Sequence, residues 1–319
     1  MDHEKYYVGV DIGGTNTKIG LISQKGEIKN LRRLLNKDIE LTIDNFLNLV
    51  LMEIKEIINT AENPVMGIGI STPGLQMKNG RGTLSSINMP ILNNVDQQSY
   101  FETHTNLPVV VHNDLVAHSL AESYFGAGRG IDRFLSVSLG TGIGHTFILN
   151  GVPQLSLGGV SGESGRMVLD ISSTDRDSLG VIGTAEAVCG VRAIETLAKE
   201  KYSIDKTFSA HDVISAAKTG ADPVAIEIMT EIARRLAHLL VNLSSIYFPQ
   251  VISLTGGQTE AGDFFLDKCR SEYSKFSQDF FDEFLALSGE KERVRIVKSE
   301  TGGLTGLLGS IVPFLERVP

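Results

Sequence analysis

The sequence is poor in the features that mark disulfide-stapled, metal-stapled or membrane proteins. Its 319 residues include two cysteines, no tryptophan and nine prolines. Cys189 and Cys269 lie far apart, and neither has a cysteine or histidine partner at metal-ligand spacing, so we expect two buried free thiols and no zinc site. No apolar run is long enough to span a bilayer, and the first residues, MDHEKYY, do not form a signal peptide. These absences predict a cytoplasmic protein.

Basic residues are also scarce relative to acidic ones. The chain has 29 lysines and arginines against 38 aspartates and glutamates, which gives a formal net charge of −9. Such a balance offers no general attraction for nucleic acid or anionic lipid, so we expect neither as a partner. Apolar residues make up 42% of the chain. A chain of this length and composition can form two ordinary globular domains.

The most informative segment runs from Val8 to Ile22 and reads VGVDIGGTNTKIGLI. Two apolar strands flank a glycine turn, and backbone N–H groups can converge on phosphate there because Gly13 and Gly14 lack a Cβ and can take positive φ. Asp11 ends the first strand with a carboxylate suited to Mg²⁺ or its waters. An ordinary hairpin is the alternative. The predicted nucleotide-binding residues here are Asp11, Gly13, Gly14, Thr15, Asn16 and Lys18.

The segment Leu135–Leu149, LSVSLGTGIGHTFIL, repeats this pattern later in the chain. Gly140 aligns with Gly13, and Thr141 and Gly142 follow it at the tip. Two such hairpins suggest two similar domains, each offering a tip to one ligand between them, although two amphipathic hairpins could also match by chance. A third apolar run, VISLTGG, ends in Gly256 and Gly257 and could bring backbone close to a flat base.

Helical and β-branched patterns alternate along the chain, which predicts the α/β class with two domains and a largely buried mixed sheet. The expected elements are helices over 43–58, from 223 to near 249 and over 304–311, and strands over 65–71 and 109–112. The expected domains are residues 1–117, completed by the C-terminal helix 303–319, and residues 118–302.

The strand VVVHND places Asn113 and Asp114 at its carboxyl end, directly before a helix. Ligands bind at such junctions in α/β folds. Asp114 could accept a proton from a substrate hydroxyl that attacks a phosphoryl group, with Asn113 orienting the hydroxyls. Alternatively, Asp114 only caps the helix. A cap would tolerate Asp114→Ser, whereas a general base would not.

Two glutamates are further candidates for binding a polyol. The loop GGVSGESGR, residues 158–166, places four glycines around Glu163, whose carboxylate could accept two sugar hydroxyls or could be a solvated loop charge. Glu186 lies in the first turn of a predicted helix and could do the same. Its alternative role is to complement the helix dipole.

Six motifs occur in an order that resembles the ROK family of bacterial sugar kinases and sugar-responsive repressors. They are DIGGTN at 11–16, ND at 113–114, FGAGRG at 125–130, LGTGIG at 139–144, GE at 162–163 and TGG at 255–257. The resemblance implies two ribonuclease-H-like domains of the actin and hexokinase type that close on ATP and a sugar. It implies that Asp114 is the base and that the glycine turns hold ATP. The residues it implies for sugar hydroxyls are Asn88, Asn113, Glu163 and Glu186.

The chain departs from the family at its zinc site. The family pattern Gly-Glu-x-Gly-His reads GESGR here, which puts Arg166 in place of the histidine that binds zinc and substrate. The pattern Cys-x-Cys-Gly-x-x-Gly-Cys reads DSLGVIGT over 177–184, which keeps both glycines and loses all three cysteines. We therefore expect no zinc and a loop held by packing or polar contacts.

Arg166 follows Glu163 by three residues and has two predicted roles. It could form a charge-assisted pair that orients Glu163. Alternatively, it could enter the sugar pocket as a substrate-binding residue and favour an acidic or acylated sugar.

The leading hypothesis is a glucokinase-like enzyme that uses ATP and Mg²⁺ to phosphorylate a hexose or an N-acetylated hexosamine, at the C6 hydroxyl. The alternative is a ROK protein without a DNA-binding domain that senses sugar without turnover. The sugar and the phosphoryl donor stay open, polyphosphate included. A homodimer is common among the proteins that this chain resembles.

Overall fold

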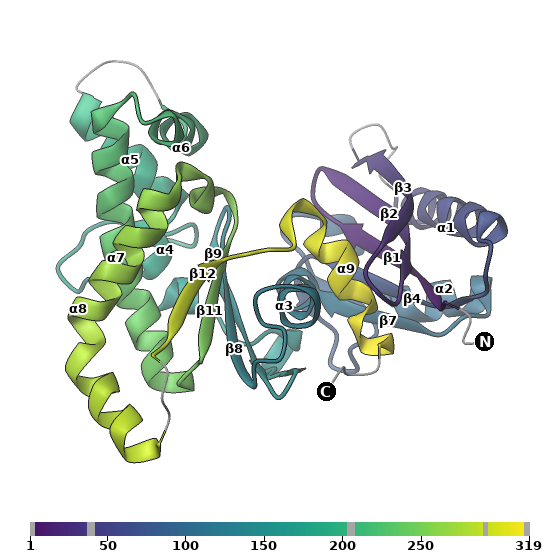
Figure 1. Cartoon of the computed structure of the whole chain (residues 1–319). Coiled ribbons are helices and arrows are strands. Elements are labelled where there is room, and N and C mark those ends of the chain that lie inside the picture. The colour runs from purple at the N-terminus through teal and green to yellow at the C-terminus, as the bar shows by residue number, and fades with distance from the viewer. Residues whose placement is uncertain (1–3, 37–41, 203–207, 290–292, 316–319) are drawn as a thin grey trace. The chain divides into compact units, whose positions relative to one another are not determined.

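A computed structural model of the chain describes residues 4–36, 42–202, 208–289 and 293–315 (Figure 1). The contacts divide the chain into two compact units. One comprises Met1–Gly130, Gly151–Ser161 and Glu300–Pro319, and the other comprises Ile131–Asn150 and Gly162–Ser299. Each unit has a mixed sheet, helices and a core, which confirms the predicted α/β class. The predicted domain limits after residues 117 and 302 stay predictions.

The first unit is built on a five-stranded sheet of order β3-β2-β1-β4-β7. Its antiparallel part consists of β1 (Tyr6–Ile12), β2 (Asn16–Ser23) and β3 (Ile28–Leu35), and the predicted strands appear as β4 (Val65–Thr72) and β7 (Val109–Asn113). Because β1, β4 and β7 run parallel, their carboxyl ends meet at one edge of the sheet.

Helices cover both faces of this sheet. Helix α1 (Ile43–Thr60) matches the predicted helix and buries its apolar stripe against Val8 and Val10 of β1. Tyr7 points to the other face and packs with α3 (Asp114–Phe125) and α9 (Thr305–Ile311). Because successive side chains of β1 point to opposite faces of the sheet, this strand contributes to two separate apolar surfaces.

Helix α9 packs against α3, β1 and β4 of the first unit. Glycines allow this approach: a Cβ on Gly69 would overlap the carbonyl of Ser310, and a Cβ on Gly309 would overlap the carbonyl of Ala117. Figure 1 shows this C-terminal helix, drawn in yellow, next to α3. Backbone thus lies against backbone along the helix.

The sheet of the second unit repeats the same strand arrangement. The strands β9 (Ile143–Leu149), β8 (Arg133–Leu139), β11 (Val251–Thr255) and β12 (Arg295–Lys298) are neighbours in that order. The first two form an antiparallel hairpin, and the other two add parallel strands. The hairpin followed by parallel strands matches β2, β1, β4 and β7, as the repeat in the sequence predicts.

The helices of the second unit are α4 (Ala185–Cys189), α5 (Val191–Tyr202), α6 (Ala210–Thr219), α7 (Pro223–Tyr247) and α8 (Asp263–Ser288). Helix α7 begins as predicted, because the Asp222 carboxylate accepts hydrogen bonds from the N–H groups of Val224 and Ala225. Helices α7 and α8 pack side by side (Figure 1). The two cysteines are free and buried, as expected.

The remaining short elements are β5 (Leu75–Gln76), β6 (Thr83–Ser85), α2 (Gln97–Thr105) and β10 (Val152–Pro153). Within the described residues, every helix is too short or too polar to cross a membrane.

Candidate functional site

The tip of the β1–β2 hairpin is a compact, internally bonded turn. The N–H of Gly13 donates to the carbonyl of Asn16 at 2.9 Å, and Asn36 Nδ2 donates to the carbonyl of Gly13 at 2.7 Å. Neither Gly13 nor Gly14 has a positive φ, although glycine can take one. A Cβ on Gly13 would lie only 3.1 Å from the carbonyl oxygen of Asn16, so glycine gives room there, and the Gly13 N–H is already used within the turn.

Asn88 lies beside this tip. It is exposed, in the loop after β6, and a Cβ on Gly14 would lie 3.4 Å from its carbonyl oxygen. The structure therefore brings one predicted sugar-binding residue next to the predicted phosphate turn. Thr15 is exposed at the same tip.

Asp11 is held at the carboxyl end of β1 by two neighbours in the sheet. Lys18 Nζ lies 3.3 Å from Asp11 Oδ2, and Ser71 Oγ donates to Asp11 Oδ1 at 3.0 Å. Lys18 also donates to the carbonyl of Gly303 at 3.1 Å. The predicted nucleotide-binding residues Asp11 and Lys18 are thus paired with each other. The sequence reasoning missed Ser71, although its place at the end of a predicted strand was a usable signal.

Asn113 is the last residue of β7, and Asp114 follows it at the same edge of the sheet as Asp11. Ser71 of β4 pairs with Asp11 of β1 on one side and with His112 of β7 on the other. Asn113 is the cap of α3: its Oδ1 accepts the N–H of Leu115 at 3.0 Å, and its Nδ2 donates to the carbonyl of Gly74. Asp114 is the first residue of the helix. Asn113 is therefore the cap residue, and Asp114 Oδ1 also accepts the N–H of Leu115, at 2.9 Å.

The environment of Asp114 raises the pKa of its carboxyl group. Burial is the largest cause, and the negative charge of Asp11 acts in the same direction. His118, one turn further along α3, and the N–H of Leu115 oppose this rise in pKa. A more basic carboxylate is better suited to accept a proton near neutral pH.

The tip of the β8–β9 hairpin resembles the first tip in its bonding. The N–H of Gly140 donates to the carbonyl of Gly142 at 3.1 Å. Thr141 is exposed at the turn. A Cβ on Gly142 would lie 2.8 Å from Glu186 Oε2, so this predicted phosphate turn borders a predicted sugar-binding carboxylate.

Gly256 follows β11 with a φ of +99°, and a Cβ there would lie 2.5 Å from the carbonyl oxygen of Leu139. The backbone of Gly256 therefore lies against the end of β8, and its approach to a flat base stays a prediction. Gly257 faces open space. This contact places Gly256 beside the Gly140 tip.

Glu163 is exposed and precedes a 3₁₀ turn, Ser164–Arg166, that packs against the first residue of β9. Gly165 permits this packing, because a Cβ there would overlap the carbonyl of Ile143. The loop that carries Glu163 is thus anchored next to the β8–β9 tip.

Arg166 does not make the predicted pair with Glu163. In the described part of the chain, the bonds of its guanidinium go to Asp177 Oδ2 at 2.8 Å, Glu186 Oε1 at 3.3 Å and Ser178 Oγ at 3.2 Å. The loop before α4 carries Asp177 and Ser178, and α4 carries Glu186. The spacing of three residues between Glu163 and Arg166 could not reveal these partners. The expected polar contacts in this loop are present.

Asp177 is the buried partner in this group. Burial alone would raise the pKa of its carboxyl group, but hydrogen bonds from Arg166, the N–H groups of Val181 and Leu179, and Thr184 Oγ1 lower it to about 2. The carboxylate therefore stays charged under all ordinary conditions.

Acid should remove the contribution of Asp177 to stability. Since the folded pKa of about 2 lies below the ordinary 3.8, this contribution is complete above pH 3.8 and disappears as the pH falls toward 2. Urea unfolding of the wild type should therefore show a steeper loss than Asp177→Asn in this window, by up to about 1.4 kcal/mol per pH unit. Equal slopes for the two proteins would contradict the assignment.

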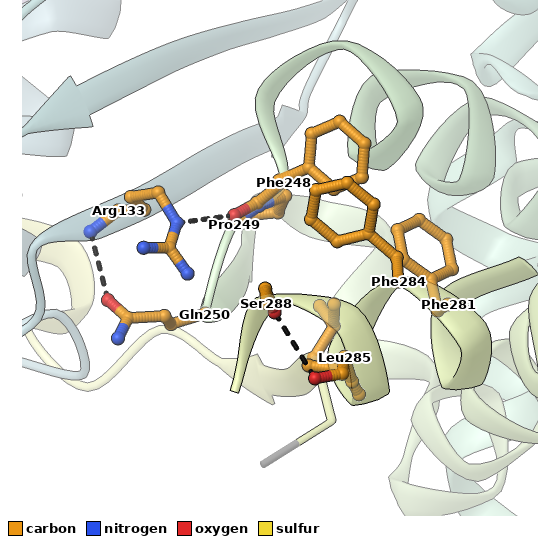
Figure 2. Close-up of a pocket in the computed structure, with 9 residues that line it drawn as sticks. Arg133, Phe248, Pro249, Gln250, Phe281, Phe284, Leu285 and Ser288 are labelled. Carbon is orange, nitrogen blue, oxygen red and sulfur yellow. Dashed lines mark hydrogen bonds between the residues drawn. The ribbon is translucent and has the colours of Figure 1, made fainter. Parts of the chain in front are cut away.

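An apolar pocket of about 290 Å³ lies elsewhere in the second unit (Figure 2). Rings from the turn after α7 and from the end of α8 line it, and Phe248 stacks on Phe284 with ring centroids 4.2 Å apart. Arg133 Nε donates to the carbonyl of Phe248 at 2.8 Å at its edge. None of the predicted site residues lines this pocket, so it is distinct from the candidate site.

Comparison with known proteins matches residues 7–315 to the model of the ROK family. The glucokinase of Thermotoga maritima is 29% identical over 280 residues, which cover 83% of this chain and 86% of that enzyme. The xylose repressor of Bacillus subtilis is 28% identical over 273 residues, which cover 84% of this chain and 68% of the repressor.

Among solved structures, the ROK hexokinase of Thermus thermophilus superimposes with a TM-score of 0.81. The match covers 96% of this chain and 97% of that one at 23% identity. This likeness confirms the predicted fold class.

Proposed function

This chain belongs to the ROK family, and on that premise we propose that it is an ATP-dependent kinase of a hexose or an N-acetylated hexosamine. The observation that carries the proposal is Asp114. Its carboxyl group has a raised pKa at the carboxyl edge of a sheet, and the neighbouring Asn113 already caps the helix. A basic carboxylate at this edge suits the abstraction of a hydroxyl proton.

In the proposed reaction, the carboxylate of Asp114 accepts the proton of the C6 hydroxyl while that oxygen forms a bond to the terminal phosphorus of ATP. The bond between this phosphorus and the bridging oxygen breaks, and ADP leaves with the electron pair. The side chains proposed to hold the other sugar hydroxyls are Asn88, Asn113, Glu163 and Glu186. Holding the hydroxyl in line contributes much of the rate in such reactions.

For the nucleotide, we propose that the two hairpin tips bind phosphate. The N–H groups of Gly13 and Gly140 are already bonded within their turns. We therefore propose that the neighbouring N–H groups and the hydroxyls of Thr15 and Thr141 bind the phosphate. Asp11 is the carboxylate proposed to bind the waters of Mg²⁺, which neutralises phosphate charge when it is bound. Gly256 and Gly257 are proposed to approach the base.

A screen for ADP release tests this proposal. Purified chain is supplied with Mg-ATP and a panel of neutral hexoses and N-acetylated hexosamines, and a parallel set contains polyphosphate as the donor. We expect turnover with at least one sugar at a rate well above that of Asp114→Asn, and ³¹P–¹H correlation should place the phosphate on C6. Rates no higher than the Asp114→Asn control with every sugar and donor would refute it.

The xylose repressor among the relatives supports a second candidate, a protein that senses sugar without turnover. Thermal unfolding distinguishes the two. A sensor should be stabilised by its sugar and should release no ADP, whereas a kinase should be stabilised by its sugar and should also release ADP.

A further inference from the structure

Four side chains of the second unit form one connected polar group, here called the Arg166 network. Its members are Arg166, Asp177, Ser178 and Glu186. They come from three separate pieces of chain: the 3₁₀ turn after Glu163, the loop before α4, and α4 itself. The network therefore ties the loop that carries Glu163 to the helix that carries Glu186.

Within the network, the two carboxylate oxygens of Glu186 have different surroundings. Oε1 accepts hydrogen bonds from Ser178 Oγ at 2.6 Å, from the N–H of Ser178 at 3.3 Å and from Arg166 Nη1 at 3.3 Å. Oε2 lies on the side of the β8–β9 tip, 2.8 Å from where Gly142 would carry a Cβ. The side chain is 11% exposed. One oxygen is thus fixed by the protein, and the other borders the turn.

Asp177 anchors Arg166 from the opposite side. Its side chain is 0% exposed, and Oδ2 accepts from both Arg166 and Thr184. Its own carbonyl accepts a hydrogen bond from Arg192 at 3.3 Å. A buried carboxylate with this many donors holds its position, and it therefore holds the guanidinium that bonds to it.

The charges of the network argue against a direct contact between Arg166 and an acidic sugar. One guanidinium is shared by the carboxylates of Asp177 and Glu186, so its positive charge is already compensated. An incoming anion would meet two carboxylates beside the arginine. Arg166 is better placed to act through Glu186 than to bind substrate itself.

We propose that Arg166 is a positioning residue for sugar binding: together with Ser178 it fixes Glu186 Oε1, so that Oε2 faces a sugar hydroxyl beside the Gly140–Gly142 turn. This inference rests on the proposed function, in which Glu186 binds the sugar. Without Arg166, the carboxylate of Glu186 can rotate away and must be reordered for each sugar that binds, which weakens binding.

Arg166→Met should raise the KM for the sugar by about 10- to 100-fold while the KM for ATP changes little, since a displaced binding group costs about this much. Arg166→Lys, which keeps one charged contact, should lie between Met and the wild type. The double variant Arg166→Met/Glu186→Gln should bind sugar no worse than Glu186→Gln alone, because the two residues act as one unit.

Removing Arg166 leaves Asp177 buried without its partner and could unfold the loop. The variant Arg166→Met/Asp177→Asn removes this unpaired charge and should still show the raised KM for the sugar. Arg176→Met is the matched control, because Arg176 lies on the same loop and donates to the carbonyl of Gly180 at 2.7 Å. This control should leave the KM for the sugar unchanged.

The outcomes separate the inference from the proposed function. If the wild type turns over sugar and Arg166→Met/Asp177→Asn has the same sugar KM as Arg176→Met, the positioning role is wrong and the kinase stands. Additive effects of Arg166→Met and Glu186→Gln would also overturn it. If the wild type binds sugar in calorimetry without turnover, the kinase fails, and weaker binding by the Arg166 variants still supports the positioning role.

Discussion

Replacing Asp114 by asparagine should lower kcat for the best sugar substrate by about 10²- to 10⁴-fold, the range that loss of a general base produces. The amide has nearly the shape of the carboxylate and can still accept the N–H of Leu115, which Asp114 Oδ1 binds at 2.9 Å. The start of α3 should therefore survive, since Asn113 supplies its cap. The KM for the sugar should change much less than kcat.

A pH profile gives the same residue a second test. A base must be unprotonated, so kcat/KM of the wild type should fall as the pH drops through the pKa of Asp114, which burial raises above its ordinary value. This acid limb should be absent from the residual activity of Asp114→Asn. Residual activity with the same limb would assign the titration to another group.

Asp96→Asn is the matched control for a carboxylate at a helix start. Asp96 caps α2 in the same unit and accepts the N–H of Ser99 at 2.7 Å, but it is no part of the candidate site. This variant should keep full kcat. If Asp114→Asn and Asp114→Ser also kept kcat within about tenfold of the wild type, Asp114 would have only a structural role.

The elements predicted correctly are those whose signals are local. Helix α1 has one apolar stripe, α7 has an Asp-Pro start, and β4 and β7 are short apolar runs, so each carries its own evidence in consecutive residues. Helix α8, with 26 residues, was not predicted. Its aromatic residues are spread over several sides, and Phe276 and Phe280 are 42% and 51% exposed, so no single buried stripe marks the helix.

The candidate site likewise has features that local sequence signals indicate and features that they do not. The order of motifs selects Asp114 and the two tips as candidates, because each motif is contiguous, and their roles stay predictions. The partner of Arg166 was predicted wrongly, since Asp177 is eleven residues away and reaches it only through the fold of the intervening loop. The conformation of Gly13, which has no positive φ, likewise depends on a distant residue, because Asn36 Nδ2 donates to its carbonyl. Contacts between separate segments determine both features.

The second large effect that we expect is on stability, from Gly309→Ala in α9. The new Cβ would overlap the carbonyl of Ala117 in α3, and because that obstacle is backbone, no side chain can rotate to relieve it. Overpacking of this kind costs about 1–3 kcal/mol or more. The higher helix propensity of alanine returns only about 1 kcal/mol.

The larger part of the loss in the free energy of unfolding should come from the buried apolar side chains of α9. If the helix shifts away from α3, Leu307 and Ile311, both fully buried, lose part of their contact with the sheet. Exposing either side chain costs about 1.5–3 kcal/mol. We therefore expect the free energy of unfolding to fall by about 3 kcal/mol or more in urea denaturation.

Gly303→Ala is the control for this substitution, because nothing lies within 4 Å of a Cβ there, and it should leave stability nearly unchanged. Equal stabilities of the two variants would contradict the close packing of α9. The shift should also affect the candidate site, since Gly306 of the same helix lies against the carboxylate of Asp11. The folded fraction of Gly309→Ala should thus have a raised KM for ATP, whereas Gly303→Ala should have the same KM for ATP as the wild type. A short terminal helix would then determine both the stability of the first unit and the position of its proposed metal-binding carboxylate.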